Sequence, residues 1–111
     1  MNPDLCRLAT RVAERIGAQA YNDVVAICGL SRLSALEVER AVREYGATPC
    51  APPPDFCDHL NIAEILGEPA AWSVWFPIWT VEEGRSDLTV RMTCRVREGR
   101  MVIDLDDLRV P

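Results

Sequence analysis

The chain has 111 residues, a formal net charge of −5 and a charged fraction of 26%. This length suits a single domain over residues 1–111, and the balance of apolar and charged residues is typical of a globular core. The negative net charge argues against nonspecific binding to nucleic acid, and no apolar run approaches the roughly 20 residues that a membrane span needs.

The N-terminal segment and the cysteines suggest where the chain works. Residues 1–10 lack the charged start and the continuous apolar stretch of a secretory signal peptide. The five cysteines are an odd number and are scattered along the chain, unlike the paired cysteines of a secreted disulfide framework. We therefore expect a cytoplasmic protein that binds neither a membrane nor nucleic acid.

Residues 1–46, the helical part of the domain, predict about three helices. Asn2 is a favourable N-cap for the first helix, Pro3 suits its first position, and Gly17 ends it. A short second helix is expected over residues 20–28. Ser34 and Glu37 form a capping box that opens a third helix, and Gly46 is its natural end.

Residues 47–59 predict a stiff connector without an α-helix, because they contain four prolines. We do not interpret this connector as a domain boundary, since neither flanking half is long enough to be stable alone. The residues after it, 60–111, are expected to complete the same domain.

Alternating apolar and polar residues predict an antiparallel β-meander in residues 60–111. The clearest strands are 72–79, 88–97 and 101–105, and residues 61–66 are a shorter candidate. Each strand gathers its apolar residues on one side, which the helices are expected to cover. The predicted class is therefore α+β, with about three N-terminal helices packed on one face of a curved antiparallel sheet of three to five strands.

The segment EEGRS, residues 82–86, is predicted to be the tip of a hairpin in which Gly84 supplies the unusual backbone angles. The register that keeps the apolar residues together pairs Ile78 with Leu88 and Phe76 with Val90. A second hairpin is expected to turn at residues 98–99.

The same registers place an aromatic residue, a cation and an acid in a row on the polar face of the sheet. Trp75 falls opposite Arg91, and Arg91 falls opposite Asp106. One interpretation is cross-strand stabilisation of a solvated face. The other is an interaction surface, because Trp and Arg are typical interface anchors. The candidate surface is this row and the adjoining tip: Trp75, Trp79, Arg91, Asp106, Glu82, Glu83, Arg85 and Asp87.

The nearest approach to a metal site is the group of Cys50, Cys57, Asp58 and His59. Its spacing differs from the paired short spacings of zinc sites, and a Cys50–Cys57 disulfide is an alternative. His59 is the only histidine and has no neighbouring nucleophile. We therefore predict no metal, no cofactor and no catalytic residue. The remaining cysteines are interpreted as small hydrophobic residues: Cys6, Cys28 and Cys94.

The run W-S-V-W-F-P-I-W-T-V-E-E-G-R-S-D-L-T at residues 72–89 resembles the signature of an uncharacterised family of small bacterial proteins, W-x-V-x-F-x-(I/L)-W-T-x-E-E-G-R-S-D-L-T. The segments RLSALEVERAVREYGAT and VIDLDDLRV are also similar to that family, so the likeness covers roughly residues 32–110. The chain departs from the family pattern in its extra cysteines and triple proline. The order of helices and then strands is similar to NTF2-like (cystatin-type) α+β rolls, a likeness of fold alone.

Two classes of function follow. The first is a small non-enzymatic module that binds a protein partner or forms a homodimer through the candidate surface, one version being an immunity-type protein that neutralises a toxin. The second is a small-molecule-binding protein, or a lyase/isomerase-like enzyme, that uses the cavity of the roll. The second needs polar groups on the inner face, where only Tyr21 or Tyr45 from the helices could supply a hydroxyl. We therefore favour the first.

Overall fold

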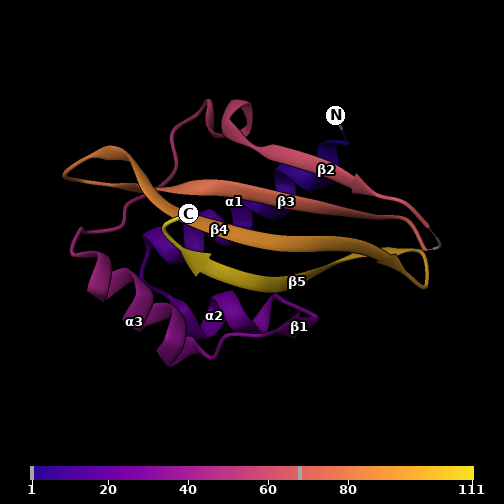
Figure 1. Ribbon diagram of the computed structural model, residues 1–111, viewed down its shortest axis with the longest axis horizontal. Helices are drawn as coiled ribbons and strands as arrows, with labels where there is room; N and C mark the ends of the chain where they lie inside the picture. Colours follow the sequence, from indigo (N-terminus) through magenta and orange to yellow (C-terminus); the bar gives the residue numbers. More distant parts are fainter. Residues whose placement is uncertain (1, 68) are drawn as a thin grey trace.

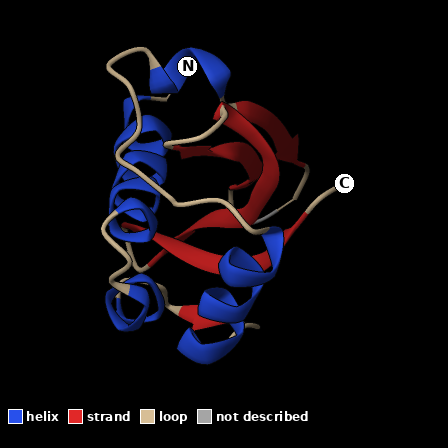
Figure 2. Cartoon of the chain, turned by 90° about the vertical axis from the view of Figure 1, so that its left-hand side faces the viewer, coloured by secondary structure: helices blue, strands red, loops and turns tan. Residues whose placement is uncertain are grey.

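The structure, a computed structural model, describes residues 2–67 and 69–111, and its helices gather on one side of a curved sheet (Figures 1 and 2). The chain forms α1 (Pro3–Gly17), α2 (Tyr21–Ala26), β1 (Leu30–Ser31), α3 (Ala35–Tyr45), the 3₁₀ turn η1 (Phe56–His59), β2 (Asn61–Ile65), β3 (Ala71–Thr80), β4 (Gly84–Arg97) and β5 (Arg100–Arg109). The predicted α+β class, with N-terminal helices against a curved sheet, is confirmed.

Helices α1 and α3 begin and end at the residues that the sequence signals indicate, whereas α2 is shorter than the expected 20–28. The Asn2 side chain accepts a hydrogen bond from the Asp4 amide at the start of α1. Ser34 and Glu37 form both bonds of the capping box at the start of α3. Gly46 ends α3 in the left-handed conformation, with φ of 90°.

The sheet has the order β1-β5-β4-β3-β2 and does not close into a barrel. Its four long strands form the expected antiparallel meander, but β1 pairs with β5 in parallel, so the sheet is mixed. The sequence pattern does not reveal β1, because a strand of two residues is too short to show an alternation.

The core lies between the inner face of the sheet and the helices. In Figure 1, α1 runs behind β3 and β4, while α2 and α3 lie beside β5. The inner-face residues are almost fully buried and pack with apolar residues of α1, α2 and α3 in one cluster. The strands contribute Val74, Phe76, Ile78, Leu88, Val90, Met92, Cys94, Ile103, Leu105 and Leu108. In the strands predicted at 72–79, 88–97 and 101–105, the alternating apolar residues are buried except Trp72, Val96 and Met101, which are partly buried.

The predicted pairing of Ile78 with Leu88 is wrong, because the β3–β4 ladder shifts after Pro77. Pro77 pairs with Thr89, whereas Trp79 pairs with Arg85, so β4 accommodates two extra residues in between. The buried Ser86 hydroxyl closes this irregularity by donating to the Ile78 carbonyl (2.7 Å). The turn is consequently centred on residues 81–83, slightly before the predicted centre.

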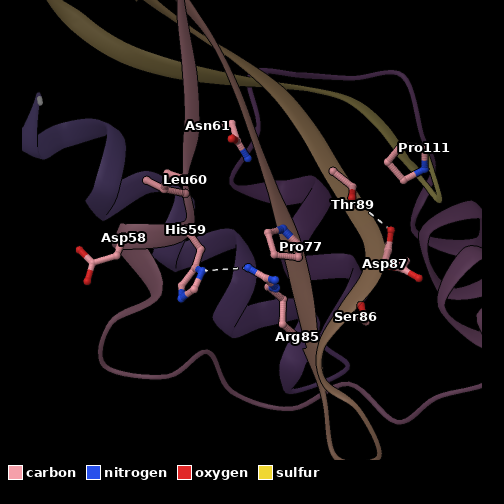
Figure 3. Close-up of a pocket in the computed structure, with 10 residues that line it drawn as sticks. All are labelled: Asp58, His59, Leu60, Asn61, Pro77, Arg85, Ser86, Asp87, Thr89 and Pro111. Carbon is pink, nitrogen blue, oxygen red and sulfur yellow. Dashed lines mark hydrogen bonds between the residues drawn. The ribbon is translucent and has the colours of Figure 1, made fainter.

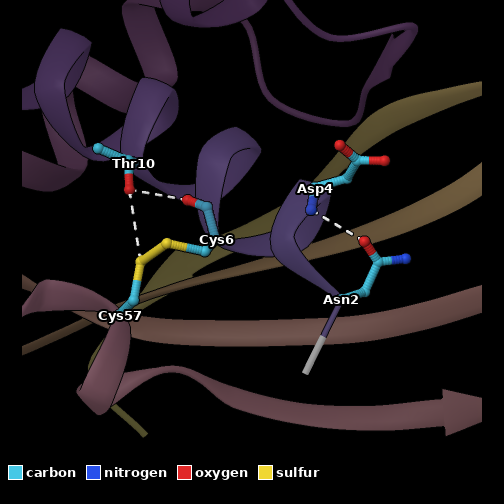
Figure 4. The surroundings of a disulfide bond; sticks show 5 residues. All are labelled: Asn2, Asp4, Cys6, Thr10 and Cys57. Atoms are coloured by element: carbon cyan, nitrogen blue, oxygen red, sulfur yellow. Dashed lines mark hydrogen bonds between the residues drawn. A yellow bond between two sulfur atoms is a disulfide. The ribbon is translucent and has the colours of Figure 1, made fainter.

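A disulfide joins α1 to the connector, between Cys6 and Cys57 (Figure 4). The Thr10 hydroxyl donates to the Cys6 carbonyl and lies 3.7 Å from the Cys57 sulfur. This pairing overturns both the interpretation of Cys6 as a plain hydrophobic residue and the alternative Cys50–Cys57 bond. Sequence spacing could not indicate it, because the two cysteines are 51 positions apart and meet only in the folded chain.

Candidate functional site

The outer face of the sheet, which points toward the viewer in Figure 1, is the side that none of the described helices covers. We define it by the outward side chains of β3, β4 and β5. These are Ser73, Trp75, Pro77, Thr89, Arg91, Thr93, Arg95, Val102, Asp104, Asp106 and Asp107. The face combines one large aromatic residue with many charged groups, and so differs sharply from the apolar inner face.

Trp75 and Arg91 form the centre of the outer face, as the register predicted. They are directly opposite one another on β3 and β4. The Arg91 guanidinium lies over the indole, with its central carbon 5.2 Å from the ring centroid. Such a cation–π contact is worth about 0.5–1 kcal/mol at an exposed site. Arg91 is exposed and forms no ion pair with any described residue, so its charge remains open to a partner.

The acid opposite Arg91 is Asp107, so the predicted partner Asp106 is wrong by one position. A bulge between Arg91 and Met92 shifts the β4–β5 ladder, and Met92 pairs with Leu105. The bulge allows both consecutive acids to face outward. Asp106 instead accepts a hydrogen bond from Thr93 (2.6 Å), while Asp107 forms an ion pair with Arg109, whose Nε lies 2.9 Å from Asp107 Oδ2.

The part of the outer face nearest β1 is a closed polar network. Arg95 Nε donates to Asp104 Oδ2 at 2.8 Å, and the Asp104 side chain is only 6% exposed. The other oxygen, Oδ1, has no hydrogen-bond partner among the described residues. Because Asp104 is buried and Arg95 is already paired with it, the open groups of the face lie toward Trp75.

The acids at the hairpin tip are held by the end of α3 and the residues after it. Glu82 accepts hydrogen bonds from the backbone amide (2.7 Å) and the hydroxyl (2.8 Å) of Thr48, and these bonds lower the pKa of its carboxyl. The Tyr45 hydroxyl donates to Glu83 (2.6 Å), which raises the pKa of the tyrosine, and accepts from the Asp87 amide (3.1 Å). These four hydrogen bonds fasten the tip to the helical layer.

Trp79 packs against residues of η1 and is not part of the open surface around Trp75. Its ring packs edge-on against Phe56, with centroids 5.7 Å apart, and against His59, at 5.2 Å. Arg85 pairs with Trp79 across the hairpin, and its Nη1 lies 3.5 Å from His59 Nδ1. His59 Nε2 lies 3.5 Å from Asp55, so the imidazole bridges a carboxylate and a guanidinium.

Two adjoining hollows line the open half of the outer face. The larger, of about 450 Å³, includes His59, Asn61, Pro77 and Arg85 (Figure 3). The smaller, of about 120 Å³, lies over Trp75 between Arg91, Asp107 and Arg109. Both are lined by Thr89 and Pro111, so they adjoin one another, and we name the two hollows together the outer-face groove. The groove holds aromatic, apolar and cationic groups together.

The cysteines and the single histidine do not assemble a metal site within residues 2–67 and 69–111. Cys57 could not serve the considered metal cluster, because its sulfur is bonded to Cys6. Two of the free thiols are shielded. Burial, reinforced by the nearby Asp104 carboxylate, raises the pKa of Cys28 to about 11 and that of Cys94 to about 12.

The structure therefore brings together part of the predicted surface and divides the rest. Trp75 and Arg91 meet, and Arg85 lies at the far end of the same groove. Glu82 and Glu83 serve the internal fastening, and Trp79 packs under η1. The predicted surface does not include Thr48, His59, Thr89, Asp107 or Arg109, and His59 is considered above only as a possible metal ligand. Alternation predicts that Asp107 and Arg109 face outward only if the position of the bulge is known. The place of His59 in the site could be predicted only if η1 were known to lie beside Arg85.

The fold and the groove define a class of protein: a small α+β fold with helices on one face of its sheet and an open aromatic and cationic groove on the other. Residues 13–111 match the family described as Domain of unknown function (DUF7668), and the chain therefore belongs to that family. A search of curated proteins and a search of solved structures each found no match. In the part of the chain that is described, every helix is too short or too polar to cross a bilayer.

Proposed function

We propose that the protein is a non-enzymatic module that binds another protein, either a foreign partner or a second copy of itself, through the outer face of its sheet. The observation that carries the proposal is the exposed Arg91 guanidinium over half-buried Trp75, at the centre of a sheet face without a helical cover. Trp and Arg are the side chains most enriched at energetically dominant interface positions.

The arrangement of the neighbouring charges supports the same location. Glu82 and Glu83 form hydrogen bonds within the chain, which leaves them less free to contact a partner. Arg85 and Arg91 form no carboxylate ion pair among the described residues. Covering an unpaired charge at an interface is costly unless the partner supplies an opposite charge. Such arginines therefore favour a complementary acidic surface. The recognition centre is therefore the groove, and the hairpin tip is its support.

The proposal includes a cytoplasmic location and, as one version, an immunity-type protein. The Cys6–Cys57 disulfide counts against that location, because a reducing cytoplasm keeps such pairs as thiols unless they are redox-active. The comparison with NTF2-like rolls rests on the order of the elements alone. The alternative of a ligand cavity between sheet and helices has less support, because Val74, Phe76 and Met92 on the inner face are fully buried against the helices.

The solution mass tests the self-association version. Light-scattering chromatography is run on the native chain and on the Trp75→Ala/Arg91→Ala variant. A matched control, Leu36→Ala/Arg40→Ala, changes two exposed residues of α3. A native dimer that only the first variant dissociates supports self-association through the outer face. A native dimer that both variants retain contradicts that version. A native monomer excludes self-association and leaves the version in which the outer face binds a foreign partner. Site-specific crosslinking tests that version.

A further inference from the structure

We infer that the outer-face groove recognises an extended acidic segment of its protein partner, with two carboxylates about four residues apart. This inference rests on the proposed function and specifies the chemistry of the partner. It follows from the charges, the geometry and the floor of the groove.

The groove has one arginine at each end that forms no ion pair among the described residues, although Arg85 Nη1 lies 3.5 Å from His59 Nδ1. Arg91 lies beside the smaller hollow and Arg85 lines the larger one. Both are exposed, and neither lies within 4.0 Å of a carboxylate among the described residues. Arg109 adds a second guanidinium to the smaller hollow, and its Nε alone is engaged by Asp107. Arg donates in a fork that matches a carboxylate.

The acids of the groove do not neutralise these ends. Asp107 is engaged by Arg109 Nε and by the Leu108 amide (2.9 Å). Figure 3 shows the carboxylates of Asp58 and Asp87 pointing away from Arg85. The positive ends of the groove therefore coexist with a net charge of −5 on the whole chain. That net charge repels a long polyanion such as nucleic acid more strongly than a short acidic segment whose carboxylates lie beside the two arginines.

The spacing of the two ends sets the spacing of the acids. Arg85 and Arg91 face Trp79 and Trp75 on β3, which are four residues apart. At a rise of about 3.3 Å per residue, the two ends are about 13 Å apart along the sheet. An extended segment has the same rise, so acids about four residues apart reach both ends. The residues between them cross the apolar floor formed by Trp75 and Pro77.

A selection from a random twelve-residue peptide library, displayed on phage and panned on the full chain, tests the inference. Selected peptides are then measured by fluorescence anisotropy against the native chain, Arg85→Gln and Arg91→Gln, after circular dichroism has shown that the variants are folded. The matched control is Arg97→Gln, an exposed arginine near the other end of β4. A single-stranded oligonucleotide is the competing anionic probe.

The expected peptides carry two Asp or Glu residues about four positions apart with apolar residues between them. Each groove variant should weaken their binding about tenfold or more, while Arg97→Gln changes it little. Failure to select such peptides, equal binding by the groove variants, or tighter binding of the oligonucleotide would overturn the inference. Peptides without acids that bind through Trp75 would leave the proposed function standing and refute only the acidic specificity.

Discussion

Removing the Cys6–Cys57 disulfide should cost a large part of the stability of the domain. The bond closes a loop between residues 51 positions apart, which joins the first turns of α1 to η1. In the chain-entropy account, a loop of that length restricts the unfolded state by about 4 kcal/mol at 25 °C. Small domains have total stabilities of about 5–15 kcal/mol, so the Cys6→Ser/Cys57→Ser variant should fold but with a much smaller margin.

The native contacts around the bond indicate that removing the disulfide lowers the free energy of unfolding mainly by giving the unfolded chain more freedom. Phe56, next to Cys57, is only 2% exposed and packs edge-on against Phe76 with centroids 5.1 Å apart. Leu5, next to Cys6, is 1% exposed. These neighbours keep η1 and α1 in place without the bond, so the folded structure of the variant should change little.

Guanidinium denaturation at pH 7 measures the effect. The double serine variant should lose about 4 kcal/mol of unfolding free energy, and its m-value should rise because its unfolded chain is more expanded. Dithiothreitol should reproduce the loss in the native chain and have no effect on the variant. Cys50→Ser, at a free half-buried cysteine, is the control. A loss below about 1 kcal/mol, or a reductant effect that persists in the variant, would refute the reasoning.

Three further predictions follow from local contacts. The hydrogen bonds from Thr48 lower the pKa of Glu82 below the ordinary value of 4.5. They therefore stabilise the fold fully at a pH above 4.5, and this contribution is lost as the pH falls through the lowered pKa. Denaturation of Glu82→Gln should therefore show a deficit relative to the native chain at pH 7 that vanishes in acid, and a pH-independent deficit would contradict this account. Burial raises the pKa of Cys28 to about 11 and that of Cys94 to about 12, so iodoacetamide at pH 7.5 should label both thiols slowly in the folded chain. Peptide mass spectrometry measures the labelling, and labelling as fast as in the unfolded protein would contradict this prediction. Gly17→Ala should lower the free energy of unfolding by about 1–3 kcal/mol, because an added Cβ would collide with the connector backbone, and an unchanged denaturation midpoint would show that the connector yields.

The sequence predicts the helices and the inner face well because these depend on local, repeated signals. The capping residues Asn2 and Ser34 and the left-handed Gly46 act within a few positions of the helix that they delimit. The alternation in β4 likewise needs only the period of a strand. The pairing of Trp75 with Arg91 follows because it lies before either irregularity in the ladders.

The parts that the sequence does not predict depend on contacts that form only in three dimensions. One bulge exchanges Asp106 for Asp107 opposite Arg91, and another shift moves Ile78 away from Leu88. Register errors of this kind follow from one or two inserted residues, which alternation alone does not locate. The placement of Trp79 under η1 required knowledge of where the connector returns to the sheet.

Site-specific crosslinking tests the central claim, that the outer face binds a protein, most directly. In one variant a benzophenone amino acid replaces Thr89, which lines both hollows of the outer-face groove. In a control variant it replaces Leu36, which is 60% exposed on α3. Both proteins are irradiated in the source cell, and their adducts are identified by mass spectrometry. Our account predicts one dominant protein adduct from position 89, either a second copy or a foreign partner, and none of it from position 36. No adduct from position 89, or the same adducts from both positions, would contradict the account.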